Sequence, residues 1–461
     1  MTPMRIYRLG VVAVLLTVFA PALVEAQVIR RPPRSRGGLF GGADRPVDPN
    51  RTSSVIAMDV DLLGGWTDDV IDNERAVAEG TPRTSSGYNG VGSAALRFWR
   101  GREVRSFSMN ARTHVTQYAG EERLTGADGG VAFRSNIGDR TEVSGSGQVS
   151  FLPALTLSAF SSVQDLSTSG VVADRDPSRA AIELQSRGYS GSAGLSHRWS
   201  RTQQTAGTVE MHEQRFFGDS GIQSRFRNNR GQSANVTHEW GLTRTTGLTM
   251  AYRYWDQRVR REDGGTVPVR TDGGEAGLTM RRQLSRTRAL LLSGSGGVDH
   301  VGAFDAVNDV PYAYYALSGS GSVRLDLARS WGIAGDFRRR STMLDGISLS
   351  SFITDTVSTT FGGNLTDSFG VAVSGALSSG KSPSRGPGSF SNRIGTVQLD
   401  YAIGSWGSVV TSYSYYVHHL RLEDETPLGF PTRLIRNAVR VGMSIQLPLY
   451  GNFAGPGGTA N

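Results

Sequence analysis

The chain has 461 residues, a formal net charge of +8 at pH 7 and no cysteine, which excludes disulfides, thiolate metal sites and a lipid-modified N-terminal cysteine. Hydrophobic residues make up only 38% of the chain, and after residue 27 no apolar run is long enough for a membrane-spanning helix. Helical membrane proteins are therefore excluded.

The first element in the chain is an export signal over residues 1–26. Arg5 and Arg8 precede an apolar stretch, and the small-residue pattern at 24–26 is a cleavage site. The apolar stretch is too short for a membrane anchor. We therefore expect the mature chain to begin at Gln27.

Residues 27–52 form a short basic segment rich in proline and glycine. Such a segment buries too little apolar surface to fold, so we expect a disordered, solvated tether in the periplasm. Contact with anionic lipid headgroups is the functional alternative. Nucleic-acid binding is not indicated, because the remaining charge is spread along the chain and the export signal removes the protein from the cytoplasm.

From residue 53 to residue 450, apolar and polar residues alternate with a period of two, which is typical of strands with one apolar and one polar face. Near the start, Ile56, Met58 and Val60 alternate with Asp59 and Asp61. Alternation alone fits a soluble sandwich as well as a membrane barrel, so the turns have to decide between them.

Short turns of similar composition recur at intervals of roughly 40 to 45 residues, which indicates a hairpin repeat. They lie near Gly101, Asp139, Arg201, Arg244, Arg286, Arg329, Asp367 and Ser405. Longer polar connections separate them, for example 67–85, 219–229 and 379–392. Short periplasmic turns and long extracellular loops are the asymmetry of outer-membrane barrels. The hairpins predict an all-β, antiparallel transmembrane barrel of about 18 strands, between about 16 and 20, over residues 53–450, with a flexible tail over 451–461.

One segment, 153–186, breaks the hairpin spacing. It is either a long loop between the fifth and sixth strands or the site of an added strand pair, which would raise the count to about 20. We expect the loop.

The tryptophans lie near strand ends, where membrane barrels place aromatic girdles. Those beside a short turn form the predicted interface girdle: Trp99, Trp199, Trp240, Trp331 and Trp406. The other two, Trp66 and Trp255, lie at the opposite strand ends. A sandwich core would hold its tryptophans in mid-strand, so their placement favours the membrane barrel over a secreted all-β protein.

Together these features resemble bacterial outer-membrane β-barrel proteins, the porin-like superfamily, over nearly the whole mature chain. In that superfamily the last strand carries a signal for the barrel assembly machinery, and Arg440, Gly442, Ile445 and Leu447 match its polar, glycine and apolar positions. The final apolar position is not aromatic and the chain continues past Tyr450, which are departures from the pattern. The resemblance implies outer-membrane lipid, lipopolysaccharide and the assembly machinery as partners. It also implies that the loop at 153–186 narrows the lumen, as the loop after the fifth strand does in general porins.

Three motifs resemble sites of other chemistry, and none has the context that the chemistry needs. Residues 375–382 fit the phosphate-binding loop pattern, but Pro383 follows where a helix must begin. His418 and His419 are neighbours without acidic residues at metal-ligand spacing. Some barrels are lipases, yet serine is too abundant to give a pairing with His114 or His212 any specificity. We expect no enzyme activity, no metal and no cofactor.

A barrel of this size encloses an aqueous channel unless something fills it. We therefore expect an outer-membrane channel, either a passive diffusion pore for small solutes or a conduit for export of a surface polymer. The alternative is a structural or adhesive surface barrel that acts through its extracellular loops. Alternation points arginines and acidic residues inward in equal number, which predicts weak ion selectivity. The candidate pore-lining residues are Arg112, Arg134, Arg253, Arg281, Asp336, Arg338, Arg340 and Arg440.

Overall fold

The computed structural model describes residues 53–68, 87–102, 105–118, 123–152, 155–156, 180–182, 185–217, 228–260, 265–305, 310–327, 330–343, 351–383, 388–404, 406–421 and 433–450. The predicted signal, tether and C-terminal tail lie outside the described residues. Within the described part of the chain, no helix is long and apolar enough to cross a membrane.

The described elements are all β-strands. In chain order they are β1 (Ser53–Thr67), β2 (Gly87–Arg102), β3 (Arg105–Tyr118), β4 (Arg123–Ile137), β5 (Thr141–Leu152), β6 (Leu155–Thr156), β7 (Ala180–Ile182), β8 (Gln185–Arg198), β9 (Gln203–Phe217), β10 (Asn229–Gly241), β11 (Thr246–Arg260), β12 (Thr266–Gln283), β13 (Ala289–Asp305), β14 (Val310–Asp326), β15 (Gly332–Met343), β16 (Ser351–Asn364), β17 (Phe369–Lys381), β18 (Ser389–Ile403), β19 (Gly407–Arg421) and β20 (Arg433–Tyr450).

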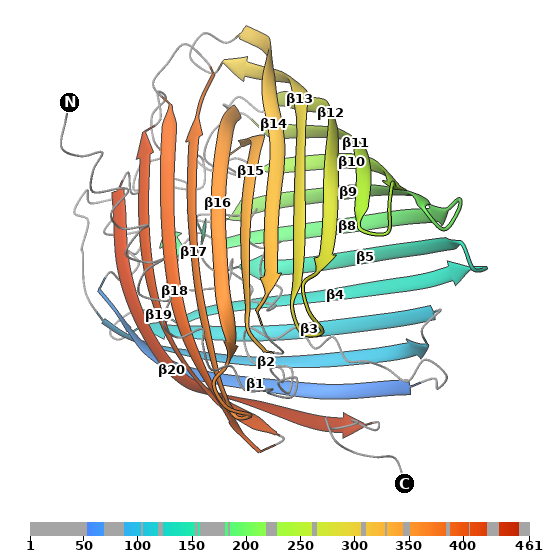
Figure 1. Ribbon diagram of the computed structural model, residues 1–461. Helices are drawn as coiled ribbons and strands as arrows, with labels where there is room; N and C mark the ends of the chain where they lie inside the picture. The colour runs from blue at the N-terminus through green and yellow to red at the C-terminus, as the bar shows by residue number, and fades with distance from the viewer. Residues whose placement is uncertain are drawn as a thin grey trace, which may run out of the picture.

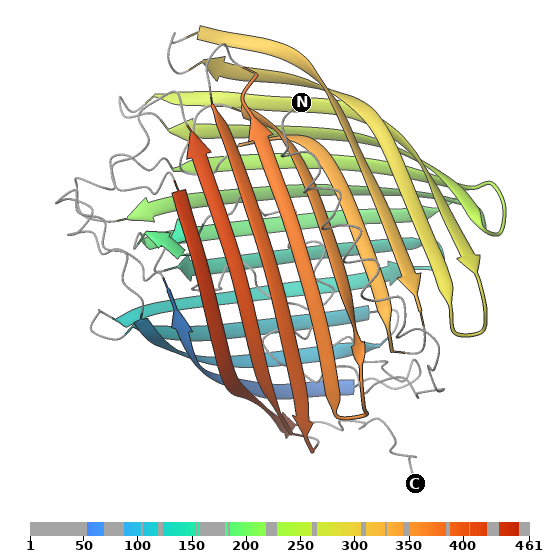
Figure 2. The same ribbon diagram turned by 60° about the vertical axis from the view of Figure 1, so that its left-hand side comes forward.

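The long strands form one closed barrel of 18 strands. Each strand pairs antiparallel with the next, β5 pairs with β8, and β20 returns to pair with β1. Figure 1 shows the strands running obliquely around the barrel, and in Figure 2 the row β15 to β20 faces the rows β1 to β11 across the interior. The predicted antiparallel barrel and its strand number are confirmed.

The segment between β5 and β8 adds no strand to the barrel among the described residues. Its two short strands, β6 and β7, pair only with each other in a separate two-stranded sheet. The alternative count of about 20 strands is therefore wrong, while residues 157–179 of the expected loop lie outside the described residues.

All the predicted short turns join strands at one end of the barrel, which we call the turn rim; we call the opposite end the loop rim. The segments 199–203, 242–246, 284–288 and 365–369 share one turn geometry, in which the first amide donates to the fifth carbonyl, for example Leu242 to Thr246 at 2.9 Å. The Thr243 hydroxyl also accepts a hydrogen bond from the Thr245 amide at 3.1 Å. Serine or threonine at this position stabilises the turn locally, which explains the repeated composition.

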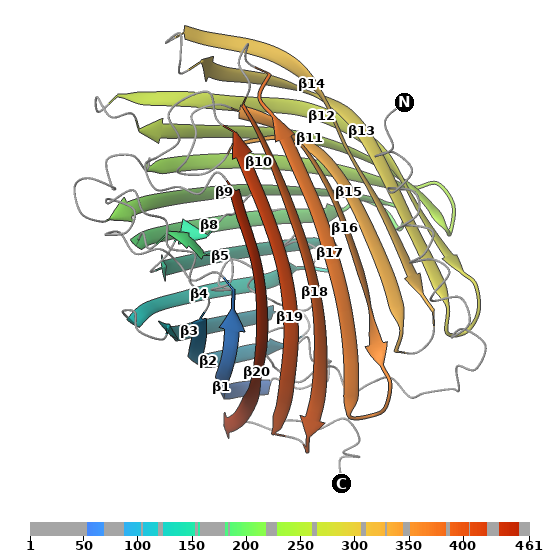
Figure 3. The ribbon, with the colours of Figure 1, turned by 90° about the vertical axis from the view of Figure 1, so that its left-hand side faces the viewer.

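The seam between β1 and β20 closes the barrel, and both strands lie side by side in Figure 3. The Asp68 carboxylate accepts hydrogen bonds from the backbone amide of Asn437, at 2.6 Å, and from its side-chain amide. A side chain in place of Gly442 would collide with the Leu62 carbonyl and with Leu63. Close backbone approach at this point therefore requires glycine.

The barrel wall has two chemically distinct faces. The outer face exposes large apolar side chains such as Leu62, Met250 and Leu278. The inner face carries the residues that alternate with them, including the buried Asp59 and Asp61. Because side chains alternate across a strand, the pairing register assigns every residue of a strand to one face.

Candidate functional site

The inner face is the candidate site, because it gathers charged and hydroxyl side chains from all parts of the barrel. The pairing register places every pore-lining candidate on this face: Arg112, Arg134, Arg253, Arg281, Asp336, Arg338, Arg340 and Arg440. Their role as the lining of a conducting pore stays a prediction.

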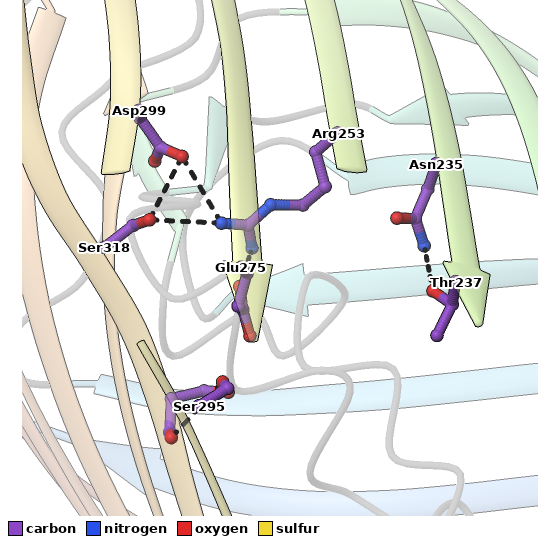
Figure 4. A network of polar contacts seen from close by, with 8 residues as sticks. Asn235, Thr237, Arg253, Glu275, Ser295, Asp299 and Ser318 are labelled. Atoms are coloured by element: carbon purple, nitrogen blue, oxygen red, sulfur yellow. Dashed lines mark hydrogen bonds and ion pairs between the residues drawn. The ribbon is translucent and has the colours of Figure 1, made fainter. Parts of the chain in front are cut away.

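A network centred on Arg253 joins four neighbouring strands on the inner face (Figure 4). The Arg253 guanidinium from β11 lies 3.0 Å from Glu275 on β12 and 3.4 Å from Asp299 on β13. The Ser318 hydroxyl on β14 donates to Asp299 at 3.1 Å and accepts from Arg253 at 3.4 Å. The Arg253 guanidinium therefore contacts two carboxylates, and Arg340 on the neighbouring strand β15 lies in electrostatic range of both.

Strand β15 carries positive charge toward the interior. Its inward residues include Arg338 and Arg340, with Asp336 as the acidic neighbour on the same strand. Directly across the sheet, Thr356 faces Arg338 and Thr354 faces Arg340. The residues opposite these arginines on β16 are hydroxyls, and the acids in electrostatic range are Asp336 for Arg338 and Glu275 and Asp299 for Arg340.

The first strands show how other inward charges are compensated. The Arg97 guanidinium on β2 contacts Asp59 on β1 at 2.5 Å, and the Ser93 hydroxyl donates to Asp61 at 2.8 Å. Arg134 on β4 pairs with Glu142 on β5. Cross-strand ion pairs of this kind keep a polar wall fixed while leaving little net charge.

Burial of the inner face changes along the barrel axis. Near the turn rim, the inward side chains of Arg134 and Arg324 are 61% and 58% exposed. Near the loop rim, the inward residues Gln257, Phe352 and His418 are each 1% exposed. The interior is therefore open near the turn rim and packed near the loop rim.

Two inward charges escaped the sequence analysis. Arg436 on β20 is 2% exposed and lies on the same face as Arg440, and Asp128 on β4 shares a face with Arg134. Both residues are an even number of positions from a residue already assigned inward on the same strand, so the period of two places them on the inner face. Adding one cation and one acid leaves the inward charges of the described side chains in balance.

The predicted girdle needs one correction. Trp199, Trp240 and Trp331 lie on the outer face beside the turn rim, and Trp406 is exposed in the turn before β19. Trp99, in contrast, pairs across from Val55 in the register that holds Arg97 and Asp59 inward, so its side chain belongs to the inner face. Position beside a turn gives the depth of a residue but not its face.

The four positions of the assembly signal divide between the two faces of β20. Arg440 and Gly442 belong to the inner face, and Ile445 and Leu447 to the outer face. Recognition by the assembly machinery stays a prediction.

The motifs for other chemistry have structural positions of their own. Residues 375–381 lie within strand β17, so the amides of the phosphate-binding loop pattern belong to the sheet. His418 faces inward, where its Nδ1 is hydrogen-bonded to the Asn392 side chain, whereas His419 belongs to the outer face. The rings of His114 and His212 lie over Gly126 and Gly231, where a side chain would collide with them, which is a packing role.

No family model and no curated protein matches the chain. Solved structures with a similar shape include OccAB2 of Acinetobacter baumannii, with 8% identity, a TM-score of 0.45, and coverage of 86% of this chain and 98% of that one. OpdQ of Pseudomonas aeruginosa has 9% identity, a TM-score of 0.45 and the same coverage. The FrpB iron transporter of Neisseria meningitidis, F3-3 variant, has 9% identity, a TM-score of 0.45, and coverage of 87% of this chain and 82% of that one. By the pairing of its own strands, the chain is a closed antiparallel barrel of 18 strands.

Proposed function

We propose that the chain is an outer-membrane channel for small polar solutes, with the turn rim in the periplasm and the narrowest part of the passage near the loop rim. The observation that carries this proposal is the division of the wall into an apolar outer face and a charged, hydroxyl-rich inner face that is solvent-accessible near the turn rim. An interior with these properties holds water and hydrogen-bonds to solutes.

The charge of the inner face indicates the class of solute. The charges of the described inner face balance overall, which favours solutes with little net charge or with both signs. The cationic residues of β15 lie beside the acidic residues of the Arg253 network, because β15 pairs directly with β14. A solute with separated charges would be oriented between these two sets of residues.

Packing of the inner face near the loop rim favours a second candidate, a surface barrel that acts structurally or adhesively through its loops. Ion conductance separates the two functions. The full chain, refolded into planar bilayers, conducts if the channel proposal holds. A fully folded barrel with no conductance at any applied voltage would favour the structural function.

Replacement of Arg338 and Arg340 by glutamate tests the inner-face assignment. The double variant R338E/R340E adds negative charge to the wall, so the reversal potential under a salt gradient should shift toward cation selectivity. The matched control is R339Q on the outer face of the same strand, which should leave the reversal potential unchanged. If the double variant conducts and its reversal potential is unchanged, the assignment of Arg338 and Arg340 to the lining of the passage is wrong.

A further inference from the structure

Near the loop rim, the outer face of β8 to β12 carries a group of exposed arginines, here called the outer arginine patch. Its members are Arg187, Arg215, Arg230, Arg258, Arg260 and Arg270. None of them belongs to the inner face, so the proposed passage of solutes does not use them.

The depth of the patch is marked by tyrosines. On β8, the next outward residue from Arg187 toward the turn rim is Tyr189. On β11, the exposed Tyr252 likewise lies on the turn-rim side of the charged positions. Toward the turn rim, the outer faces of both strands carry apolar residues such as Leu195 and Met250. Tyrosine marks the level of the headgroups in a barrel, so the guanidinium groups lie at or just beyond the lipid phosphates.

Two pairs within the patch oppose like charges. Arg187 lies directly across from Arg215, and Arg230 lies directly across from Arg258. Directly opposed side chains have Cβ atoms only about 4.5–5.5 Å apart, and like charges at that spacing destabilise a sheet. An anion shared by the two guanidinium groups of a pair removes this repulsion.

The acidic residues around the patch are too few to neutralise it. Glu213 pairs with Arg215 at 2.6 Å, and the Arg187 guanidinium lies 4.8 Å from the Phe217 ring centroid. Glu213 also lies directly across from Arg230, and among the described residues no ion pair joins Arg187 to a carboxylate. The patch therefore keeps a positive excess on a surface that contacts lipid.

Asp256 gives the patch a fixed geometry. Its side chain is 3% exposed and lies 3.2 Å from Arg270 and 3.7 Å from Arg258. The Gln232 amide donates to the same carboxylate at 3.4 Å. A buried acid that holds two exposed arginines orients their donors and does not cancel the patch, since both guanidinium groups remain about 60% exposed.

We propose that the outer arginine patch binds the phosphate groups of a glycolipid in the outer leaflet, one phosphate at each opposed arginine pair. The planar guanidinium fork matches phosphate oxygens and binds them in a bidentate manner. The inference rests on the outer-membrane location in the proposed function, but it does not depend on conduction through the lumen.

Binding of purified diphosphorylated lipid A to the refolded full chain in zwitterionic detergent micelles tests the proposal. R187Q/R230Q should weaken the affinity by about tenfold or more, because each substitution removes charge-assisted hydrogen bonds to a phosphate. The matched control is K381Q/R421Q, which removes two cations from the outer face near the loop rim of β17 and β19 and should leave the affinity within about twofold.

The variant D256N separates a positioned site from general attraction. It makes the patch more positive, so general attraction predicts tighter binding, whereas loss of the carboxylate that orients Arg258 and Arg270 predicts weaker binding. Tighter binding by D256N, or equal binding of dephosphorylated lipid A, would overturn the proposal. Displacement of the lipid by inorganic phosphate at similar concentration would also overturn it.

Conductance of the same variants keeps this proposal separate from the channel proposal. R187Q/R230Q should conduct like the parent protein, since its changes lie on the outer face. Loss of lipid binding with normal conductance supports the patch, and lipid binding by a chain that never conducts contradicts only the channel. Heat-modifiable migration in gel electrophoresis verifies that every variant is folded.

Discussion

The two ends of the barrel interior differ in how closely their inward side chains are packed. Near the loop rim the inner face is packed: Phe352 and Phe390 meet edge to face with ring centroids 5.4 Å apart, and Val301 is fully buried. Near the turn rim, the inner face carries hydrogen-bonded polar side chains and exposed ion pairs: the Gln204 side-chain amide donates to the Ser196 hydroxyl at 2.8 Å, and Arg134 pairs with Glu142. One end is therefore built like a protein core and the other like a protein surface.

This difference teaches that a single alternating pattern produces two kinds of interior. Every strand contributes inward residues to both ends, yet stability and selectivity reside in different segments of the same strand. Substitutions near the loop rim should change the free energy of unfolding, whereas substitutions near the turn rim should change mainly the local charge.

Replacement of Phe352 by alanine gives the largest expected effect. The side chain is 1% exposed, and its removal leaves a cavity, so F352A should lose about 3–5 kcal/mol of stability in a urea unfolding and refolding titration. The comparison substitution S196A near the turn rim of β8 should change stability by less than about 0.5 kcal/mol. Similar losses in both variants would break the distinction between the two ends.

Replacement of Arg253 by leucine should have an intermediate effect. Its partners Glu275 and Asp299 have side chains only 13% and 5% exposed, and R253L leaves both without their cation, which costs about 1–3 kcal/mol. The double variant R253L/E275Q should recover part of the loss in the same titration. A larger loss in the double variant would show that charge neutralisation is not what Arg253 supplies.

Replacement of Arg134 by glutamine should have the smallest effect. Arg134 pairs with Glu142 near the turn rim, and its side chain is 61% exposed, so solvent screens the pair. R134Q should lose only about 0–1 kcal/mol, and added salt should reduce the difference from the parent protein. A loss of stability as large as that of R253L would contradict this expectation, because it would show that the inner face near the turn rim is also tightly organised.

The sequence predicts the faces of strands better than it predicts contacts between them. Alternation assigns Arg338 and Arg340 to one face of β15 because the period of two is a local property of the chain. It could not show that Arg253 serves both Glu275 and Asp299, because cross-strand neighbours depend on a register that one strand does not encode alone. Trp99 lies on the inner face although it is near a turn, because it is two residues from the inward Arg97 and therefore shares its face.

The outer arginine patch shows the part of the register that the sequence does contain. Arg187 and Arg215 lie at equal distances in sequence from Arg201, the centre of the predicted turn, so the hairpin brings them face to face. Pairing across a sheet turns two unremarkable surface arginines into a site with a strong preference for anions. The depth of the patch relative to the tyrosines also depends on the register, and this depth places the site beside lipid.

The seam between β1 and β20 has a consequence for the order of folding. Asp68 and Asn437 are 369 residues apart in the chain, so the last contact of the wall joins its most distant segments, and such contacts form slowly. Until β20 docks, β1 and β19 are open sheet edges with unpaired amides and carbonyls, which are templates for aggregation. A chain that lacks β20 would therefore aggregate. It would not persist as a barrel with one strand missing.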